Sequence, residues 1–471
     1  MLTLNHLCES LFGQSSETAN QITLTNVVID SRKAQNGSVF VAIRGGHNFV
    51  SAAFEAGASI AIISEPVEGE LTTIQVGNEL PGHWSLPLCI VVDDTVLALQ
   101  KMAIAWRNKF SPTIIGITGS VGKSSTKELA YSVLSQKFQT LKSQGSYNNE
   151  IGLPFTLMKL HEDHSHAILE MGMYDLGEIE SLCQMAKPTV GLVANVGPSH
   201  LERLGSIERI AQAKQEMVEA LGPQGIAILN IDDARVNEMR HHTDAQIFTY
   251  GLTDQADLWA DEVNSQGIDG IKLVLHYEDE AIHVSAPLLG RHSVHTILAA
   301  TAIGLTQGLH WEEIVAGLQD PQARLRLIAI PGPQNSLILD DTYNASADSS
   351  IAALNLLHEL EAKRKIAVLG YMAELGAFEE EAHRKVGRRA AEVVDLLVTV
   401  GEKSSLIAQE AIASGLDQDA GTNLENKQVA LDYLQEISRD GDIILIKGSR
   451  SLGLEFIVDH LSARAQQAKA N

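Results

Sequence analysis

Short apolar runs alternate with helical patterns through the middle of the chain. These runs have the length and β-branched character of buried strands, and they cover residues 114–118, 167–170, 189–196 and 225–230. The alternation predicts a parallel, doubly wound sheet between residues 89 and 322. Ligands bind such sheets at the carboxyl ends of the strands. The residues that follow each run are therefore the first candidates for chemistry.

The regions on either side have a different pattern. Residues 1–88 contain short strands and turns, with a helix that returns to a strand over 52–61 and a linker-like segment at 79–87. A second linker-like stretch, Pro331-Gly332-Pro333, precedes another α/β alternation. Its strands are expected at 337–341, 365–370, 395–401 and 442–447, and its first helix at 350–360. The tail at 463–471 is expected to fray.

A glycine-rich loop follows the first strand of the central region. Glycines recur at 116, 119 and 122, then come Lys123 and Ser124, and the residues turn helical. This order predicts a phosphate-binding loop, because glycines let backbone N–H groups close on oxyanions and a helix N-terminus adds positive charge. Ile117 stands where the usual pattern has a glycine. The alternative is a plain strand-to-helix turn. The lysine and hydroxyl in register favour ATP or a close relative, and the residues expected to bind it are Thr118, Gly119, Ser120, Val121, Gly122, Lys123, Ser124 and Ser125.

The next two strands end at ionisable residues. Glu170 ends the second run, and His200 follows the third. Both should lie on the same sheet edge as Ser124, where a carboxylate and an imidazole could hold a second divalent cation beside the γ-phosphate. The alternatives are a solvated strand end for Glu170 and a hydrogen-bonded loop residue for His200.

Other polar residues carry weaker signals. Lys214 lies in a helical pattern and is most simply a solvated lysine. Asn230 ends a strand, where it could bind a base or ribose or cap the next helix. Ser31 and Arg32 form a turn that could bind a phosphate or sugar, or simply hold a local ion pair in solvent. Polar residues also end two strands of the last region, namely Asp341, Tyr343, Asn344 and Lys447.

Length and charge narrow the class of protein. The chain has 471 residues and a net charge of −24, with 45% apolar residues. We therefore predict an α/β protein of three domains: a small N-terminal α/β domain (1–88), a doubly wound P-loop ATPase-like domain (89–322) and a Rossmann-like C-terminal domain (323–471). The negative charge argues against nucleic acid or an anionic membrane as partner. Any anionic substrate must be bound by local basic groups and helix ends.

The cysteines and the N-terminus indicate the compartment. Cys8, Cys89 and Cys183 have no CxxC spacing, so neither a disulfide framework nor a zinc site is indicated. The chain begins without a basic segment and a long apolar run, and no run is long enough to span a bilayer. We expect a cytoplasmic monomer.

At these motifs the chain resembles the Mur ligases, over nearly its whole length, and within them the branch that adds a dipeptide. The matching blocks are Asp30-Ser31-Arg32, Gly116 to Ser124, Tyr147-Asn148-Asn149-Glu150, Leu169-Glu170-Met171-Gly172, Gly197-Pro198-Ser199-His200, Asp341-Thr342-Tyr343-Asn344 and Lys447-Gly448-Ser449-Arg450. The resemblance implies that ATP phosphorylates the carboxylate of UDP-N-acetylmuramoyl-tripeptide. The amine of D-Ala-D-Ala then attacks the acyl phosphate, and phosphate leaves.

The resemblance also implies roles for individual residues. Lys123 and Mg²⁺ on Ser124 would stabilise the transferring phosphoryl group, Glu170 and His200 would hold a second Mg²⁺, and Lys214 would carry a carbamate. Nucleotide contacts are implied for Asn230, Thr296, Arg324 and Asp341. Substrate contacts are implied for Ser31, Arg32, Arg44, Asn148, Asn149, Tyr343, Asn344 and Lys447. The chain departs from the family pattern at Ser293 and Thr296, where asparagines are usual, at Ala323, where glycine is usual, and at Ser346-Ala347, where Asn-Pro is usual.

Two kinds of alternative remain at this stage. One is a ligase that adds a single amino acid, either another Mur ligase or a relative of folylpolyglutamate synthase. The other is a nucleotide-dependent switch or binding module that binds a cell-wall precursor without turnover. Phosphate release with D-Ala-D-Ala rather than with single amino acids would separate these classes.

Overall fold

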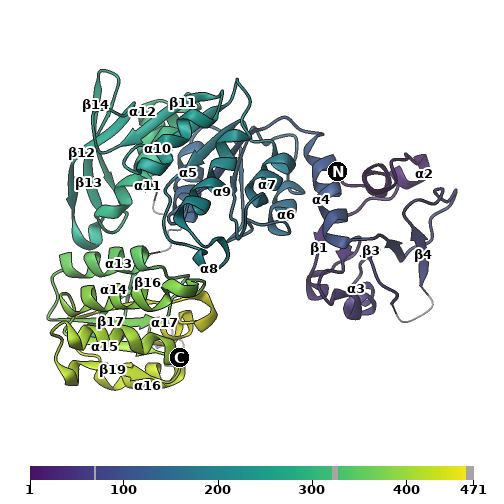
Figure 1. Ribbon diagram of the computed structural model, residues 1–471. Helices are drawn as coiled ribbons and strands as arrows, with labels where there is room; N and C mark the ends of the chain where they lie inside the picture. Colours follow the sequence, from purple (N-terminus) through teal and green to yellow (C-terminus); the bar gives the residue numbers. More distant parts are fainter. Residues whose placement is uncertain (68–70, 321–326, 463–471) are drawn as a thin grey trace. The chain divides into compact units, whose positions relative to one another are not determined.

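The computed structural model describes residues 1–67, 71–320 and 327–462 (Figure 1). The chain forms two compact units, one made of Met1–Gly116, Gln139–Gly172 and Glu178–Pro188, the other of Ile117–Phe138, Met173–Gly177 and Thr189–Asn471. The expected tail at 463–471 lies outside the described residues. Among the described residues, no helix combines the length and apolar character that crossing a membrane requires.

The first sheet is small and parallel. Its order is β1-β2-β3-β5-β4, and its strands are β1 (Val27–Val28), β2 (Val39–Val41), β3 (Ile60–Ile63), β4 (Thr72–Gln75) and β5 (Leu88–Val91). Its helices are α1 (Leu4–Leu7), α2 (Glu17–Asn20), α3 (Val50–Glu55) and α4 (Thr95–Arg107). Val39 and Val41 pack in one apolar cluster with α1 and α4, whereas Phe40 packs in another with α3. Successive strand residues therefore bury opposite faces of the sheet.

The Pro81-Gly82 segment does not link two domains. It joins β4 to β5, and these two strands pair with each other in the first sheet. This part of the sequence prediction is wrong, because a proline–glycine turn has the same composition inside a domain as between domains. The first sheet also continues to Val91, past the boundary expected at residue 88.

The second sheet has nine strands in the order β14-β13-β12-β11-β10-β9-β6-β8-β7. They are β6 (Thr113–Thr118), β7 (Thr140–Lys142), β8 (His166–Glu170), β9 (Val190–Val193), β10 (Ile226–Asn230), β11 (Gln246–Gly251), β12 (Leu258–Ser265), β13 (Ile271–Tyr277) and β14 (Glu280–Ala286). The four expected strands are present as β6, β8, β9 and β10. The antiparallel edge from β12 to β14 was not predicted. Strand β14 mixes buried and exposed residues, so it lacks the continuous apolar run of a strand buried on both faces.

The helices of this region are α5 (Lys123–Leu134), α6 (Gly152–Leu157), α7 (Glu178–Ala186), α8 (Leu201–Leu204), α9 (Ile207–Glu219), α10 (Ala234–Glu238), α11 (Val294–Thr306) and α12 (Trp311–Leu318). Helix α5 packs against both α11 and α12. The contact with α12 is close at Gly317, where an added Cβ would lie 2.4 Å from the Cα of Val133. Since α5 begins at Lys123, this contact fixes the direction of the helix that follows the glycine loop.

The third sheet confirms the second α/β alternation. Its order is β15-β16-β20-β17-β18-β19, with β15 (Ile328–Pro331), β16 (Leu337–Asp341), β17 (Arg364–Gly370), β18 (Leu396–Val400), β19 (Gly421–Leu424) and β20 (Asp442–Lys447). Helices α13 (Ala347–Glu359), α14 (Glu379–Ala391) and α15 (Ser405–Ala413) pack on one face, and α16 (Lys427–Ile437) and α17 (Glu455–Leu461) on the other. The predicted α/β class, with doubly wound parallel strands, is confirmed.

The α5–α12 contact gives the first testable prediction. Gly317→Ala should lower the free energy of unfolding by about 1–3 kcal/mol, because the new methyl group meets the backbone of Val133 and cannot be accommodated by a rotamer change. Thermal unfolding followed by circular dichroism measures the change. Gly222→Ala is the control, since no atom lies within 4 Å of a Cβ there. Equal unfolding midpoints for the two variants would contradict the prediction, because they would mean that α5 and α12 can move apart without loss of stability.

Candidate functional site

The glycine loop connects β6 to α5 and depends on backbone angles that favour glycine. Gly119 has φ +152° and Gly122 has φ +87°. A Cβ at Gly119 would lie 3.0 Å from the Cβ of Ala194, whereas the space around Gly122 is open. The Nζ of Lys123 donates to the carbonyl of Gly119 at 2.5 Å and to that of Ser120 at 3.4 Å. The lysine thus folds back over its own loop.

The segment after β9 holds the first half of this loop. The side-chain oxygen of Asn195 accepts from the backbone N–H groups of Ser120 (3.1 Å) and Val121 (2.9 Å), and its amide nitrogen donates to the carbonyl of Val121 at 2.9 Å. The Ser120 hydroxyl donates to the carbonyl of Gly197 at 2.9 Å and accepts from its N–H at 2.8 Å. Since Asn195 occupies the amides of Ser120 and Val121, donors for a phosphate have to come from later in the loop.

Two hydroxyl groups at the loop fit an oxyanion and its counter-ion. The Oγ1 of Thr118, at the end of β6, is buried with no hydrogen-bond partner among the described residues. Ser124 is buried in the first turn of α5. The N-terminus of a 12-residue helix adds a partial positive charge. The arrangement confirms the strand–loop–helix context that the sequence predicts.

Glu170 ends β8 and is 1% exposed. Its carboxylate accepts from the side-chain amide of Asn148 at 2.8 Å, and its backbone N–H donates to Ser143 at 3.2 Å. The structure thus brings together two predicted site residues. Asn149 acts differently, because its side-chain oxygen accepts from the N–H of Gly152 at 2.9 Å, at the start of α6.

His200 follows β9 and caps α8, with a left-handed backbone (φ +58°). Its Nδ1 lies 2.5 Å from Oε2 of Glu374, and the ring of Tyr174 meets it edge-on with centroids 4.9 Å apart. The hydrogen bond from His200 lowers the pKa of Glu374. Sequence reasoning missed Glu374, which follows the end of β17. Glu170 and His200 were selected because polar residues that follow a parallel strand are candidates for the site, and we call this the strand-end rule. The same rule, applied to β17, would have found Glu374.

Lys214 is not a solvated helix residue. It lies in α9 and is 2% exposed. Burial lowers its pKa well below the ordinary value, and the charge of Lys123 lowers it further. Burial therefore favours the neutral form of this amine more than in an exposed lysine.

The strand ends of the third sheet bring together another predicted set. Asp341 and Lys447 are register partners on β16 and β20. The Nζ of Lys447 is 2.6 Å from Oδ2 of Asp341 and donates to the carbonyl of Asn344 at 2.9 Å. The guanidinium of Arg450 lies over the ring of Tyr343, 5.3 Å from its centroid.

Asn230 and Thr296 belong to the predicted nucleotide contacts. The side chain of Asn230 donates to the carbonyl of Ala194 at 3.0 Å and accepts from the N–H of Asp232 at 3.1 Å, so it joins β10 to the end of β9. Helix α10 is capped by Asp233 instead. Thr296 lies in the first turn of α11, beside His295, whose Nε2 is 2.8 Å from Oδ2 of Asp232. Arg324 lies outside the described residues.

Three predicted substrate residues lie at the surface of the first unit. Ser31 and Arg32 form a short helical turn, and Arg32 pairs with Asp30 at 2.9 Å. This pair lowers the pKa of Asp30 to about 2, so the local ion pair considered as an alternative is present. Arg44 pairs with Glu150 at 3.3 Å.

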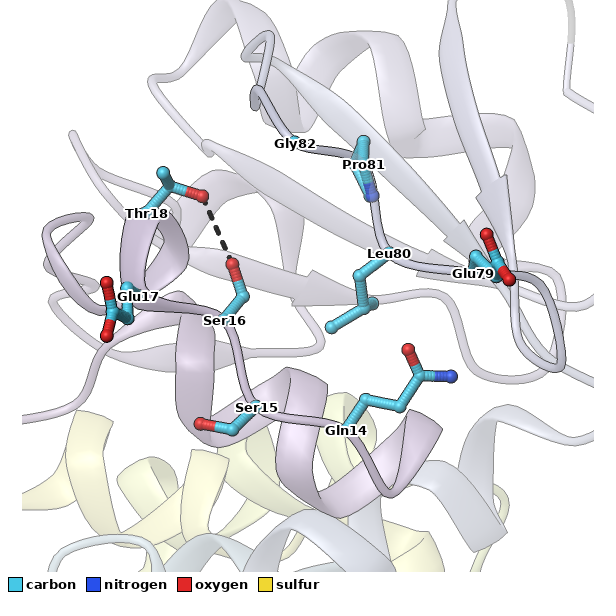
Figure 2. Close-up of a pocket in the computed structure, with 9 residues that line it drawn as sticks. All are labelled: Gln14, Ser15, Ser16, Glu17, Thr18, Glu79, Leu80, Pro81 and Gly82. Atoms are coloured by element: carbon cyan, nitrogen blue, oxygen red, sulfur yellow. Dashed lines mark hydrogen bonds between the residues drawn. The ribbon is translucent and has the colours of Figure 1, made fainter.

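A pocket in the first unit contains none of the predicted residues (Figure 2). It has a volume of about 590 Å³ and lies between the segments 14–18 and 79–82. Its side chains are neutral or acidic, with Glu17 and Glu79 at its edges. It therefore offers no positive charge for a phosphorylated substrate.

With this geometry in place, comparison with known proteins identifies the class. Two family models match, the Mur ligase middle domain over residues 117–304 and the Mur ligase, glutamate ligase domain, over residues 323–450. The UDP-N-acetylmuramoyl-tripeptide–D-alanyl-D-alanine ligase of Synechocystis sp. is 36% identical over 97% of this chain and 96% of that protein. The chain belongs to the Mur ligase family.

Solved structures agree with this assignment. MurF from Acinetobacter baumannii is 29% identical, with a TM-score of 0.82 over 98% of both chains. MurF ligase from Thermotoga maritima, solved in complex with ADP, is 26% identical, with a TM-score of 0.77 over 92% of this chain and 96% of that one. The similarity thus extends over all three sheets of this protein.

The side chain of Asn195 gives the second testable prediction. Asn195→Ala should leave the N–H of Val121 without its acceptor, while the N–H of Ser120 keeps only the backbone carbonyl of residue 195. A buried donor that water cannot reach costs about 1–3 kcal/mol. We expect faster hydrogen exchange, most clearly at Val121, measured by mass spectrometry or NMR, and a lower unfolding midpoint. The exposed Asn264, on β12, gives the control variant Asn264→Ala. Unchanged exchange at Ser120 and Val121 would contradict the proposed role of Asn195.

Proposed function

We propose that this Mur ligase joins D-alanyl-D-alanine to UDP-N-acetylmuramoyl-tripeptide in an ATP-dependent, ADP-forming reaction of peptidoglycan precursor synthesis. The observation that carries the proposal is the match to a dipeptide-adding ligase over 97% of this chain. The glycine loop with Lys123, and the buried Lys214 near it, would supply the chemistry that such a reaction needs.

The reaction has two steps. The terminal carboxylate of the tripeptide attacks the γ-phosphorus of ATP, and ADP leaves. The amine of the dipeptide then attacks the acyl carbon and loses a proton, and phosphate leaves through a tetrahedral intermediate. The protein's contribution is to position the groups and stabilise charge, so no nucleophilic side chain is needed.

Lys123 and its loop would bind the phosphates. In the structure Lys123 donates to the carbonyl of Gly119, and this weak neutral acceptor can be exchanged for a phosphate oxygen. Residues Thr118 to Ser125 would surround the β- and γ-phosphates. We propose further contacts to the nucleotide from Asn230, Thr296, Arg324 and Asp341.

The oxygen donors Ser124 and Glu170 fit magnesium, and His200 adds a nitrogen donor. Mg²⁺ takes hard oxygen ligands and usually keeps several waters, with one or two protein ligands and substrate phosphates completing its shell. No group of three or more acidic, histidine or cysteine side chains suited to a metal occurs in the described part of the chain. Ser124 would hold one ion, and Glu170 and His200 a second. The ions would neutralise the charge that develops on the transferred phosphoryl group.

Lys214 is proposed to react with carbon dioxide to form a carbamate. Its buried amine has a lowered pKa, and a neutral amine is the form that can attack carbon dioxide. The product would carry a negative charge close to Lys123, which converts a repulsive lysine pair into an attractive one.

The three predicted regions would divide the substrates among them. We propose that 1–88 binds the UDP-precursor through Ser31, Arg32 and Arg44, that 89–322 binds ATP, and that 323–471 presents the dipeptide through Tyr343, Asn344 and Lys447. Asn148 and Asn149 would contact the tripeptide side of the reaction. We place the ligase in the cytoplasm, where ATP and nucleotide-linked precursors are available, and we propose that it acts as a monomer.

Phosphate release tests the function. Purified protein with ATP and Mg²⁺ should release phosphate when UDP-N-acetylmuramoyl-tripeptide and D-Ala-D-Ala are both present. Release should fall to background when a single amino acid replaces D-Ala-D-Ala, or when a UDP-linked dipeptide replaces the tripeptide substrate. Lys123→Ala removes the positive charge that would stabilise the transferred phosphoryl group, so it should reduce the rate of phosphate release to background. Equal release with single amino acids would contradict the assigned substrate.

Lys214 gives a separate prediction. Lys214→Ala should lower the rate of phosphate release by at least about tenfold, because an electrostatic partner of the reacting phosphates is lost. Added acetate or formate should partly restore the rate by occupying the position of the carbamate. Lys101→Ala, in an exposed part of α4, is the control. A Lys214→Ala variant with the wild-type rate would remove Lys214 from the mechanism.

A further inference from the structure

The loop after β17 reaches the segment that follows β9. This loop, residues 371–376, leads from β17 into a short helical turn at Gly376–Phe378. Its Glu374 contacts the segment 195–202 twice: its carboxylate lies 2.5 Å from Nδ1 of His200, and its carbonyl accepts from the N–H of Glu202 at 3.3 Å. Gly376 makes this approach possible, because a Cβ there would lie 2.9 Å from the Cα of Glu202.

Both partners hold unusual backbone angles at the contact. His200 has φ +58° and Glu374 has φ +65°, and neither is a glycine. Such a conformation is costly for a residue with a side chain and persists only where surrounding contacts determine it. Left-handed backbone on both sides of this close contact indicates that the contact itself is maintained.

Helix α14 holds the loop that carries Glu374 through a buried histidine. His383, in α14, is 0% exposed, and its Nε2 accepts from the N–H of Met372 at 3.0 Å. Its Nδ1 donates to the carbonyl of Glu379 at 2.6 Å. Both ring nitrogens of His383 are thus used within its own domain, which marks it as a structural support for the loop.

A carboxylate at Nδ1 determines what the other nitrogen of His200 can do. A carboxylate oxygen and a nitrogen lone pair repel each other at 2.5 Å, so this contact is favourable only when Nδ1 carries the proton. In the neutral ring Nε2 then keeps its lone pair for a metal ion or a proton, and the ring is held at one angle. Tyr174 supports the same orientation by meeting the ring edge-on.

We propose that Glu374 is a positioning residue for His200. It fixes the tautomer with the proton on Nδ1 and directs Nε2 toward the reacting phosphates. The inference rests on the proposed role of His200 in the ligase reaction. It adds that a residue of the third sheet completes the site that the second sheet begins. Segment 195–202 also forms hydrogen bonds with the phosphate loop, through Asn195 and Ser120. The same segment therefore contacts a loop of the second sheet and a loop of the third.

Nitrogen NMR on the protein labelled with ¹⁵N-histidine tests the tautomer directly, without nucleotide or metal. The signals of His200 are assigned by their loss in His200→Gln. We expect the Nδ1–H form in the wild type and in the exposed-residue control Glu436→Ala, and a clear loss of that form in Glu374→Ala. Glu374→Gln, which keeps the shape and one acceptor oxygen, should retain most of it. A wild-type tautomer in Glu374→Ala would overturn the proposal.

Phosphate-release kinetics supply the second readout. Glu374→Ala should lower kcat about 10–100-fold, the range seen when a hydrogen-bond partner of a metal-binding histidine is lost, while KM for the UDP-linked substrate stays unchanged. In a His200→Gln background the same change should have no further effect, because Glu374 acts through His200. An undiminished effect in that background would overturn the proposal. If the wild type fails to ligate D-Ala-D-Ala, the proposed function falls, and the tautomer experiment still decides the role of Glu374.

Discussion

The hydrogen bonds between the glycine loop and the segment after β9 are the interactions on which the rest of this site depends. A glycine-rich loop has little intrinsic shape, because glycine loses more backbone entropy on folding than any other residue. Asn195 gives the first half of the loop a fixed shape by accepting from two of its amides and donating to one of its carbonyls. The second half leads into the N-terminus of α5, where we propose that the phosphates bind.

The second constraint is that a strongly acidic protein must attract phosphates with a few local positive charges. The net charge of −24 repels nucleotide phosphates at long range, so attraction has to be local. Lys447 is 2% exposed and pairs with Asp341, and burial beside Lys123 lowers the pKa of Lys214. Lys123 donates to the carbonyls of Gly119 and Ser120 in its own loop.

The strand-end rule explains what sequence could predict and what it could not. Asp341 and Lys447 were recognised because each ends an apolar run, and parallel strands bring such ends together. The roles of Asn195, Asn149 and Arg32 depend on which backbone group or side chain lies opposite, and apolar periodicity carries no such information. Strand β14, at the sheet edge, was missed because exposed residues interrupt its apolar pattern. Glu374 could have been found by applying the same rule to β17.

The central claim is that the phosphate loop, Glu170 and His200 serve one reacting phosphate. A crystal structure with a non-hydrolysable ATP analogue, Mg²⁺ and UDP-N-acetylmuramoyl-tripeptide tests it most directly. We expect Lys123 on the γ-phosphate, one cation on Ser124, and a second cation between Glu170 and His200 that also contacts the tripeptide carboxylate. A structure in which Glu170 keeps only its bond to Asn148, and His200 points away from the nucleotide, would contradict the account.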